Sequence, residues 1–247
     1  MDLNADMGES FGRWRIGDDE ALLGYVTSAN VACGFHAGDP LTMRSTVQRA
    51  AERGVAVGAH PAYRDLAGFG RRFIDVARAE LTADIIVQLG ALQAMCTANA
   101  TEIRYVKPHG ALYNRAAVDE VHARAIVDAI RDVNPAWPVL TLPGSVLARE
   151  AERAGLRAVG EAFADRNYRP DGTLVPRSHQ DALVRDGVAE RVVEMVTTGR
   201  VPAVDGTPVA IAAESVCLHG DTPGAVQLAA EVRAALDAAG VRLEPFA

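Results

Sequence analysis

Short apolar runs alternate with longer amphipathic stretches along the whole chain. Seven of the short runs read as β-strands, and several show little alternation of polar and apolar positions. A run of that kind is typical of a parallel strand that is covered on both faces. We therefore predict strands at residues 3–6, 29–33, 55–60, 105–108, 139–142 and 158–163, with a last one ending near residues 216–218.

The stretches between these strands follow the helical period. Asp39 is a typical N-cap residue, and Pro40 suits the first position of the helix that follows. Apolar stripes predict this helix up to Gly54, a second one through residues 81–96 and a third one through residues 225–236. Alternation of strands and helices without a break in composition predicts one domain over residues 1–247. About seven β/α units fit a parallel (β/α) barrel, complete or distorted, better than an open sheet.

Composition narrows the range of functions and locations. The 247 residues are 49% hydrophobic but only 5% aromatic, so aliphatic side chains fill a large core. The net charge of −7 makes nucleic acid an unexpected partner. The acidic start does not resemble a signal peptide, and no run of apolar residues is long enough to predict a membrane span. Three widely spaced cysteines argue against a disulfide framework, so we expect a cytoplasmic protein.

Polar side chains gather where the predicted strands end. One histidine alone is more often a structural residue than a functional one, and His122 lies inside a predicted helix. In a parallel barrel, however, the carboxyl ends of the strands converge on one rim, which is where substrates bind. Residues 166–179 show no clear period and are expected to form a long loop over this rim. The candidate site residues are Asn4, Asp6, His36, His60, Lys107, His109, Glu161, Asp165, Arg166, His219 and Asp221.

Lys107 is distinctive because it is the only lysine among the 25 basic residues. In a chain that uses arginine everywhere else, a lysine at a strand end indicates that a planar guanidinium would not serve there. A compact ammonium suits a developing oxyanion or a phosphoryl oxygen. Lys107 is therefore predicted to be functional.

Residues 36–40 (HAGDP) and residues 219–223 (HGDTP) resemble each other. In each segment a histidine follows a predicted strand, a glycine makes a turn, and an aspartate comes before a proline. We expect Asp39 to cap its helix. Asp221 either caps the last helix or orients His219, and the sequence leaves both readings open.

Other chemistries fit the chain less well. There is no glycine-rich phosphate loop, no dinucleotide-binding fingerprint and no serine nucleophile elbow. Cys33 is expected to be a small buried side chain rather than a nucleophile. A zinc or manganese site built from Asp6, His36 and His60 is chemically reasonable. No closely spaced ligand motif supports it, so no metal is assigned.

Several long motifs occur together in one order. They are residues 2–9 (DLNADMGE), 30–39 (NVACGFHAGD), 58–61 (GAHP), 107–113 (KPHGALY), 161–166 (EAFADR) and 217–221 (CLHGD). In this combination the chain resembles the LamB/YcsF family from residue 2 to about residue 225. The resemblance implies a barrel akin to the glycoside hydrolase/deacetylase group. It also implies hydrolysis of the lactam of 5-oxo-L-proline to L-glutamate, coupled to hydrolysis of ATP to ADP and phosphate, in a 5-oxoprolinase complex with two other components, the B and C subunits.

Roles follow from that chemistry as hypotheses. Phosphorylation would activate the lactam oxygen, after which water attack needs a base, a cation and an acid. The catalytic candidates are Asp6 or His60 as base, Lys107 as electrostatic stabiliser, and His109 or His219 as acid. Arg166 could bind the substrate carboxylate. The remaining substrate-binding candidates are Asn4, His36, Glu161, Asp165 and Asp221.

Two alternatives remain open. A stand-alone metal-dependent amide hydrolase or deacetylase would need neither ATP nor partners. A protein that only binds a ligand is disfavoured, because a mere binding pocket would be more apolar.

Overall fold

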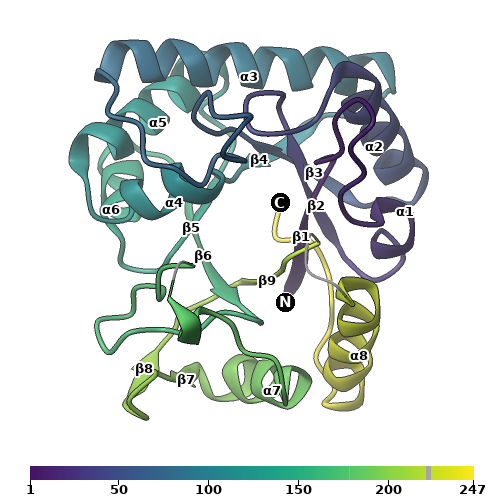
Figure 1. Cartoon of the computed structure of the whole chain (residues 1–247), viewed down its shortest axis with the longest axis vertical. Coiled ribbons are helices and arrows are strands. Elements are labelled where there is room, and N and C mark those ends of the chain that lie inside the picture. The colour runs from purple at the N-terminus through teal and green to yellow at the C-terminus, as the bar shows by residue number, and fades with distance from the viewer. Residues whose placement is uncertain (178, 221–223) are drawn as a thin grey trace.

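Seven parallel strands close into a barrel in a computed structural model, which describes residues 1–177, 179–220 and 224–247 (Figure 1). The strands pair in the order β1-β2-β3-β4-β5-β6-β9, and β9 closes the ring by pairing with β1. The predicted parallel barrel is confirmed, and each predicted strand lies within two residues of the observed one. The barrel strands are β1 (Asp2–Met7), β2 (Ser28–Ala32), β3 (Ala56–His60), β4 (Ile103–Val106), β5 (Val139–Thr141), β6 (Ala158–Phe163) and β9 (Ser215–Leu218).

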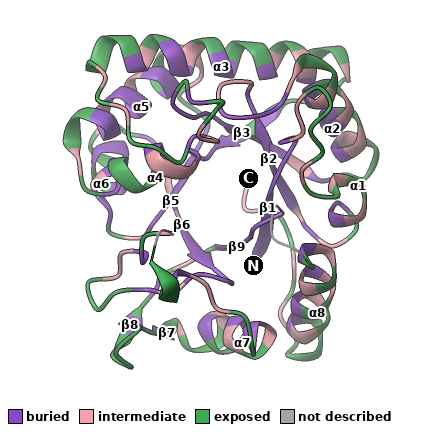
Figure 2. Ribbon diagram, viewed as in Figure 1, coloured by how far each residue is buried: buried purple, intermediate pink, exposed green. Residues whose placement is uncertain are grey.

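Helices surround the strands and bury one face each against them, while their outer faces are exposed (Figure 2). Asp39 caps α2 as expected, because its side chain accepts a hydrogen bond from the Thr42 amide. The predicted helices through residues 81–96 and 225–236 correspond to α3 and α8. The helices are α1 (Asp19–Leu22), α2 (Pro40–Glu52), α3 (Arg78–Ala98), α4 (Gly110–Ala116), α5 (Glu120–Val133), α6 (Val146–Arg153), α7 (Val188–Thr198) and α8 (Ala225–Ala238), with a 3-10 turn η1 (Gln180–Ala182).

An antiparallel pair, β7 (Arg200–Pro202) and β8 (Pro208–Ala210), is the part of the sheet structure that the sequence did not predict. Each strand has only three residues and one proline, which is too little for a period of two to be recognised. The pair lies beside α7, outside the barrel (Figure 1). The described part of the segment 166–179 is irregular, as predicted, and isolated bridges of Arg166 with Leu183 and of Tyr168 with Ala203 tie it to its surroundings.

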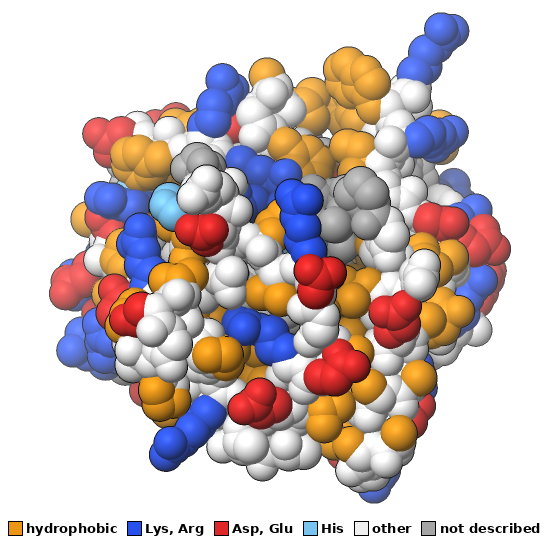
Figure 3. All heavy atoms as spheres, turned by 60° about the horizontal axis from the view of Figure 1, so that its bottom comes forward, with side chains coloured by type: hydrophobic (Ala, Val, Ile, Leu, Met, Phe, Trp, Pro, Cys, Tyr) orange, Lys and Arg blue, Asp and Glu red, His pale blue; other side chains and the backbone are white. Residues whose placement is uncertain are grey.

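Among the described helices one, α3, is long and apolar enough by length and composition to cross a membrane. In the structure it packs along α5 and against α2, β3 and β4, and residues such as Leu89 and Leu92 are fully buried there. This packing is that of an outer helix of a barrel. All three cysteines are free and buried, in agreement with the expectation that they form no disulfides. On the face drawn in Figure 3, basic and acidic side chains are intermingled rather than segregated.

The two faces of β1 explain how the barrel can have a polar interior. Leu3, Ala5 and Met7 belong to the hydrophobic layer between strands and helices. Successive residues of a strand point to opposite sides, so Asp2, Asn4 and Asp6 point into the barrel. Polar side chains therefore run along the barrel interior up to the carboxyl ends of the strands.

Candidate active site

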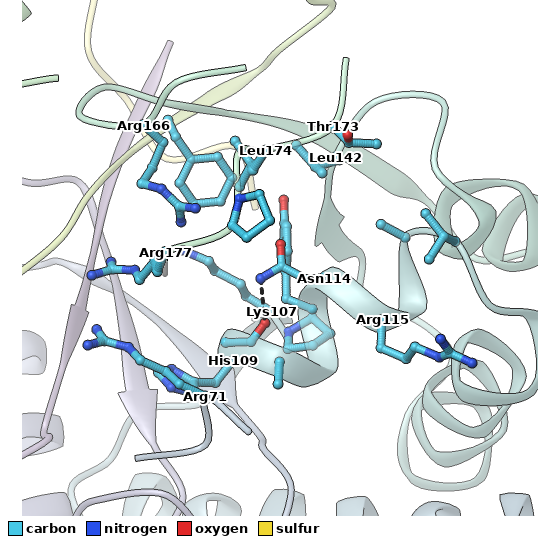
Figure 4. Close-up of a pocket in the computed structure, with 18 of the residues that line it drawn as sticks. Arg71, Lys107, His109, Asn114, Arg115, Leu142, Arg166, Thr173, Leu174 and Arg177 are labelled. Carbon is cyan, nitrogen blue, oxygen red and sulfur yellow. Dashed lines mark hydrogen bonds between the residues drawn. The ribbon is translucent and has the colours of Figure 1, made fainter. Parts of the chain in front are cut away.

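A pocket of about 710 Å³ opens at the carboxyl ends of the strands. This size is within the range of small-molecule sites. Its walls combine the ends of β1, β3, β4 and β9 with α4 and the loop after β6, and Figure 4 shows them in close-up. Six of the sequence-predicted residues line it: Asp6, His60, Lys107, His109, Arg166 and His219. Asn4, His36, Glu161 and Asp165 are buried around it, and Asp221 is outside the described residues.

Lys107 is buried at the inner end of the pocket, with 2% of its side chain exposed. Its ammonium nitrogen, Nζ, lies 2.8 Å from Glu161 Oε1 and 3.0 Å from Asp6 Oδ1. It also donates hydrogen bonds to Asn4 Oδ1 at 3.2 Å and to Cys217 Sγ at 3.0 Å. The ammonium is thus shared between two carboxylates that come from different strands of the barrel, β1 and β6.

Burial and charge act in opposite directions in this cluster. Burial favours the neutral lysine, but Asp6, Cys217 and Glu161 outweigh it and raise the pKa of Lys107 well above its usual value. Burial likewise opposes ionisation of Asp6, yet His60 and Lys107 hold the pKa of that carboxyl well below its usual range. Lys107 is therefore charged at neutral pH, and Asp6 is an ionised but weak base.

An amide network behind the lysine fixes its acceptors. Asn30 Nδ2 donates to both Asn4 Oδ1 (2.7 Å) and Asp6 Oδ1 (2.8 Å), and its own Oδ1 accepts from the hydroxyl of Tyr105 at 2.6 Å. Asn4 Nδ2 in turn donates to Glu161 Oε1 at 3.1 Å. Gly58 is required here, because a Cβ at that position would lie 2.2 Å from the Tyr105 ring. Asn4 and Glu161 therefore contact Lys107 and do not line the pocket.

Three histidines pack together beside this network. His60 Nε2 lies 3.4 Å from Asp6 Oδ1 and 3.0 Å from His109 Nδ1. The His36 ring stacks on the His109 ring with a centroid distance of 3.7 Å. Glu9 borders the group, with its Oε1 3.2 Å from His36 Nε2 and 3.7 Å from His109 Nδ1. Burial, together with the neighbouring histidines, lowers the pKa of His36 and of His109 well below the usual value.

His219 forms a separate acid–base pair with Asp165. Its Nδ1 lies 2.7 Å from Asp165 Oδ1, and its ring stacks on Phe163. Burial opposes ionisation of Asp165, but the charges of His219, Arg177 and Arg166 outweigh it and lower the pKa of this carboxyl. A carboxylate on Nδ1 fixes the orientation of the imidazole and leaves Nε2 for a bound molecule. Among the described residues, the aspartate that contacts His219 is thus Asp165, which the sequence had suggested as a substrate ligand, while Asp221, the other candidate, lies outside them.

Arginines dominate the outer part of the pocket. Arg71, Arg166 and Arg177 are grouped on one side in Figure 4, and Arg115 lies on the opposite side. Arg166 is buried and donates to the backbone carbonyls of Ala182 (3.3 Å) and Val175 (2.6 Å). Burial and the neighbouring Arg177 lower its pKa to about 10, so it keeps its charge at neutral pH. Arg166 both fastens the long loop and contributes positive charge to the pocket.

Several residues of the site were not singled out by the sequence analysis. Asn30, Cys217 and Glu9 carry recognisable side chains in or just after strands and lie within the family motifs, so position alone could have indicated them. Arg71 and Arg177 lie in loops that show no periodic pattern of polar and apolar residues, and only the fold brings them to the pocket.

The fold and the site together define a (β/α)-barrel enzyme with a buried charged cluster and an arginine-rich pocket at the carboxyl ends of its strands. A sequence model described as "LamB/YcsF family" matches residues 1–247. The chain belongs to this family.

Relatives and solved structures agree with this assignment. A protein of Mycobacterium avium (strain 104), named as the A subunit of 5-oxoprolinase, is 59% identical over 248 residues, which cover 100% of this chain and 98% of that protein. A protein of the same name from Mycolicibacterium paratuberculosis is 58% identical with the same coverage. The crystal structure of the lactam utilization protein from Thermus thermophilus superposes with a TM-score of 0.94 at 45% identity, over 100% of this chain and 99% of that one.

Proposed function

We propose that the chain is the A subunit of an ATP-dependent 5-oxoprolinase. In this proposal it hydrolyses the lactam of 5-oxo-L-proline to L-glutamate while ATP is hydrolysed to ADP and phosphate, in a complex with the B and C subunits. The observation that carries the proposal is the full-length likeness to proteins named as the A subunit of 5-oxoprolinase. The charged cluster that borders the pocket supplies chemistry suited to that reaction.

The difficulty of the reaction is that a five-membered lactam is an unactivated amide. Transfer of the ATP γ-phosphoryl group to the lactam oxygen releases ADP and makes the ring carbon electrophilic. Water then adds to that carbon, the ring C–N bond breaks as the nitrogen takes a proton, and a second water releases phosphate from the acyl phosphate. Lys107 is suited to stabilise the charge that develops on oxygen. A substrate oxygen that replaces its longest contact, Asn4 Oδ1 at 3.2 Å, would receive a hydrogen bond from the ammonium.

Proton transfer is best assigned to His219. It borders the pocket, and Asp165 holds its Nδ1, so Nε2 would exchange the proton with water or with the leaving nitrogen. Asp6 remains ionised and bonded to Lys107, which makes it a weak base and suits it to hold the lysine in position. His60 and His109 stay candidates for the second proton transfer.

The arginines supply the binding contacts for anions. Arg71, Arg166 and Arg177 line one side of the pocket, where the substrate carboxylate and a transferred phosphoryl group would both be attracted. The chain contains no glycine-rich phosphate loop. ATP is therefore proposed to bind with the help of the partner subunits.

The test is release of glutamate from 5-oxoproline by the purified chain alone and with the B and C subunits, each with and without ATP. We expect glutamate only when ATP and both partners are present, with one ADP formed per glutamate.

Two variants make the test specific for this pocket. His219→Gln should abolish most of the turnover, whereas His122→Gln should keep it, because His122 is a buried histidine of α5 that pairs with Asp119 outside the pocket. Absence of glutamate from every mixture would contradict the proposal, as would formation of glutamate without ATP.

A further inference from the structure

The histidine pair His60 and His109 shows an arrangement that the acid–base roles do not explain. His60 Nδ1 lies 2.8 Å from the backbone oxygen of Lys107, and His109 Nε2 lies 2.8 Å from the backbone oxygen of Phe69. The two remaining ring nitrogens, His60 Nε2 and His109 Nδ1, face each other at 3.0 Å.

These contacts fix where the protons are. A carbonyl oxygen can only accept a hydrogen bond, so His60 Nδ1 and His109 Nε2 must both carry hydrogen. In neutral rings the facing nitrogens then both present lone pairs, which repel each other at this distance. Something positive must lie between them, either a proton on one ring or a metal ion.

We propose that His60 Nε2 and His109 Nδ1, with Glu9 and His36, bind one divalent metal ion. One ligand atom from each of these four buried residues lies within 4.8 Å of all the others. A tetrahedral zinc ion with bonds of about 2.0–2.2 Å separates its ligand atoms by about 3.3–3.6 Å. The corresponding separations in the group are 3.0 Å from His60 to His109, 3.2 Å from His36 to Glu9 and 3.7 Å from His109 to Glu9. The other three separations are at most 4.8 Å, so closing all four donors on one ion requires shifts of up to about an ångström and a turn of the His36 ring, which stacks on the His109 ring.

The surroundings of the group are those of metal-binding histidines. Such histidines commonly donate their second N–H to a carbonyl, which fixes the tautomer and the direction of the ring. The carbonyl on His109 belongs to Phe69, a non-glycine residue held at a φ of +54°. Gly70 follows it, and a Cβ there would lie 2.7 Å from His109 Cδ2. The loop thus adopts an unfavourable backbone conformation at the point where its carbonyl contacts the ring.

A second group, Asp6, Cys217 and His219, also has donor atoms within 4.8 Å of one another. It does not support a metal site, because the Lys107 ammonium already lies 3.0 Å from both Asp6 Oδ1 and Cys217 Sγ. The positive charge that those donors need is supplied by the protein itself.

The donor set indicates the kind of ion. Imidazole nitrogens and one carboxylate suit zinc or manganese, whereas magnesium and calcium prefer oxygen ligands. His60 and His109 line the pocket, so the ion would border the space where substrate binds. Ligation would also remove these two histidines from proton transfer, which leaves that role to His219. Metal binding can be tested whether or not the proposed oxoprolinase function is correct.

The experiment uses the full chain, stripped with a chelator and titrated with Zn²⁺ in a calorimeter, and separately with Co²⁺ while visible absorption is recorded. We expect one ion per chain and ligand-field bands of nitrogen-coordinated cobalt. His109→Gln and Glu9→Gln should each weaken Zn²⁺ binding by at least about tenfold. The matched control His122→Gln removes a buried histidine that contacts a carboxylate elsewhere, and it should bind like the wild type.

The alternative, a proton shared by the two rings, predicts different results. The folded, stripped wild type would then bind neither ion with one-to-one stoichiometry, and ¹⁵N NMR would show one imidazolium in the pair. Either finding overturns the proposal, as would unchanged binding in a folded His109→Gln variant. The cobalt spectrum of the wild type decides the question even if both variants fail to fold.

Discussion

Asp2 and Asp6 lie on the same strand and point to the same side, yet they differ in almost every physical respect. Both are buried inside the barrel, Asp2 where the strands begin and Asp6 where they end. Asp2 accepts hydrogen bonds from the hydroxyl groups of Thr27, Ser28 and Ser215. Burial raises its pKa, the charge of Glu161 adds to the rise, and the hydroxyl hydrogen bonds only partly oppose it.

Asp6 has the opposite surroundings. Its carboxylate contacts Lys107 and His60, which lower its pKa well below the usual value in spite of burial. In a parallel barrel the end where the strands begin serves stability and the other end serves chemistry. The two aspartates show how one strand serves both, because hydroxyl donors surround its first residue, whereas a lysine and a histidine contact its fifth. The same contrast predicts different consequences when each end is altered.

The largest effect should come from Lys107→Met. We expect turnover to fall by at least about 10²–10³-fold, because the charge that stabilises the developing oxyanion is lost. The free energy of unfolding should also fall by about 3–5 kcal/mol, since Asp6 and Glu161 would remain buried without their counter-ion. Steady-state assays of the reconstituted complex and urea unfolding measure the two effects.

The double variant Lys107→Met with Glu161→Gln separates them. Removing the negative charge of Glu161 should restore part of the lost stability while leaving turnover absent. Recovery of activity in this folded double variant would show that Lys107 is structural, and the contrast between the two ends of the barrel would fail.

A smaller effect is expected at the His219–Asp165 pair. His219→Gln should lower kcat by about 10²-fold with little change in KM, which is the lower end of the usual contribution of one general acid or base. Asp165→Asn should lower kcat less, because the imidazole remains but its orientation is no longer fixed by a charge. An increase in KM alone would instead assign the pair to substrate binding.

The lowered pKa of Asp165 adds a dependence of stability on pH. A carboxyl whose pKa is depressed on folding stabilises the protein above its unfolded value, near pH 4, and loses that contribution as the pH falls through the folded value. The free energies of unfolding of the wild type and of Asp165→Asn should therefore become more alike in acid. A difference that grows in acid would contradict this.

The architecture was predictable because the relevant signals are local. Short runs, several of them with little alternation of polar and apolar positions, located all seven barrel strands, and Asp39 with Pro40 located the start of α2. The rim was predictable as well, since parallel strands must end together, and six of the predicted residues line one pocket. The residue pairs were not predictable. Asp165 holds His219, and Lys107 joins Asp6 to Glu161, through contacts that depend on the closure of the barrel.

Glu9 and the arginines of the loops show a second reason why sequence alone falls short. Glu9 follows a strand like the other candidates, but nothing local indicates that it lies beside His36 and His109. Arg177 belongs to a segment with no period at all. Loops are positioned by contacts such as that of Arg166 with the carbonyls of Ala182 and Val175, which no pattern of hydrophobicity records.

The smallest effect is expected at the other end of the barrel, from Asp2→Asn. The raised pKa of Asp2 means that the folded state binds its proton more tightly than the unfolded chain does. Its contribution to stability is therefore present below the unfolded value, near pH 4, and is lost as the pH rises through the folded value. The wild type should lose unfolding free energy over that interval, and Asp2→Asn should remove this slope. Turnover at neutral pH should not change, because Asp2 does not line the pocket.

Urea unfolding at a series of pH values measures the slope. A variant that keeps the slope, or that loses turnover while folded, would mean that the two ends of the barrel are electrostatically coupled rather than separate.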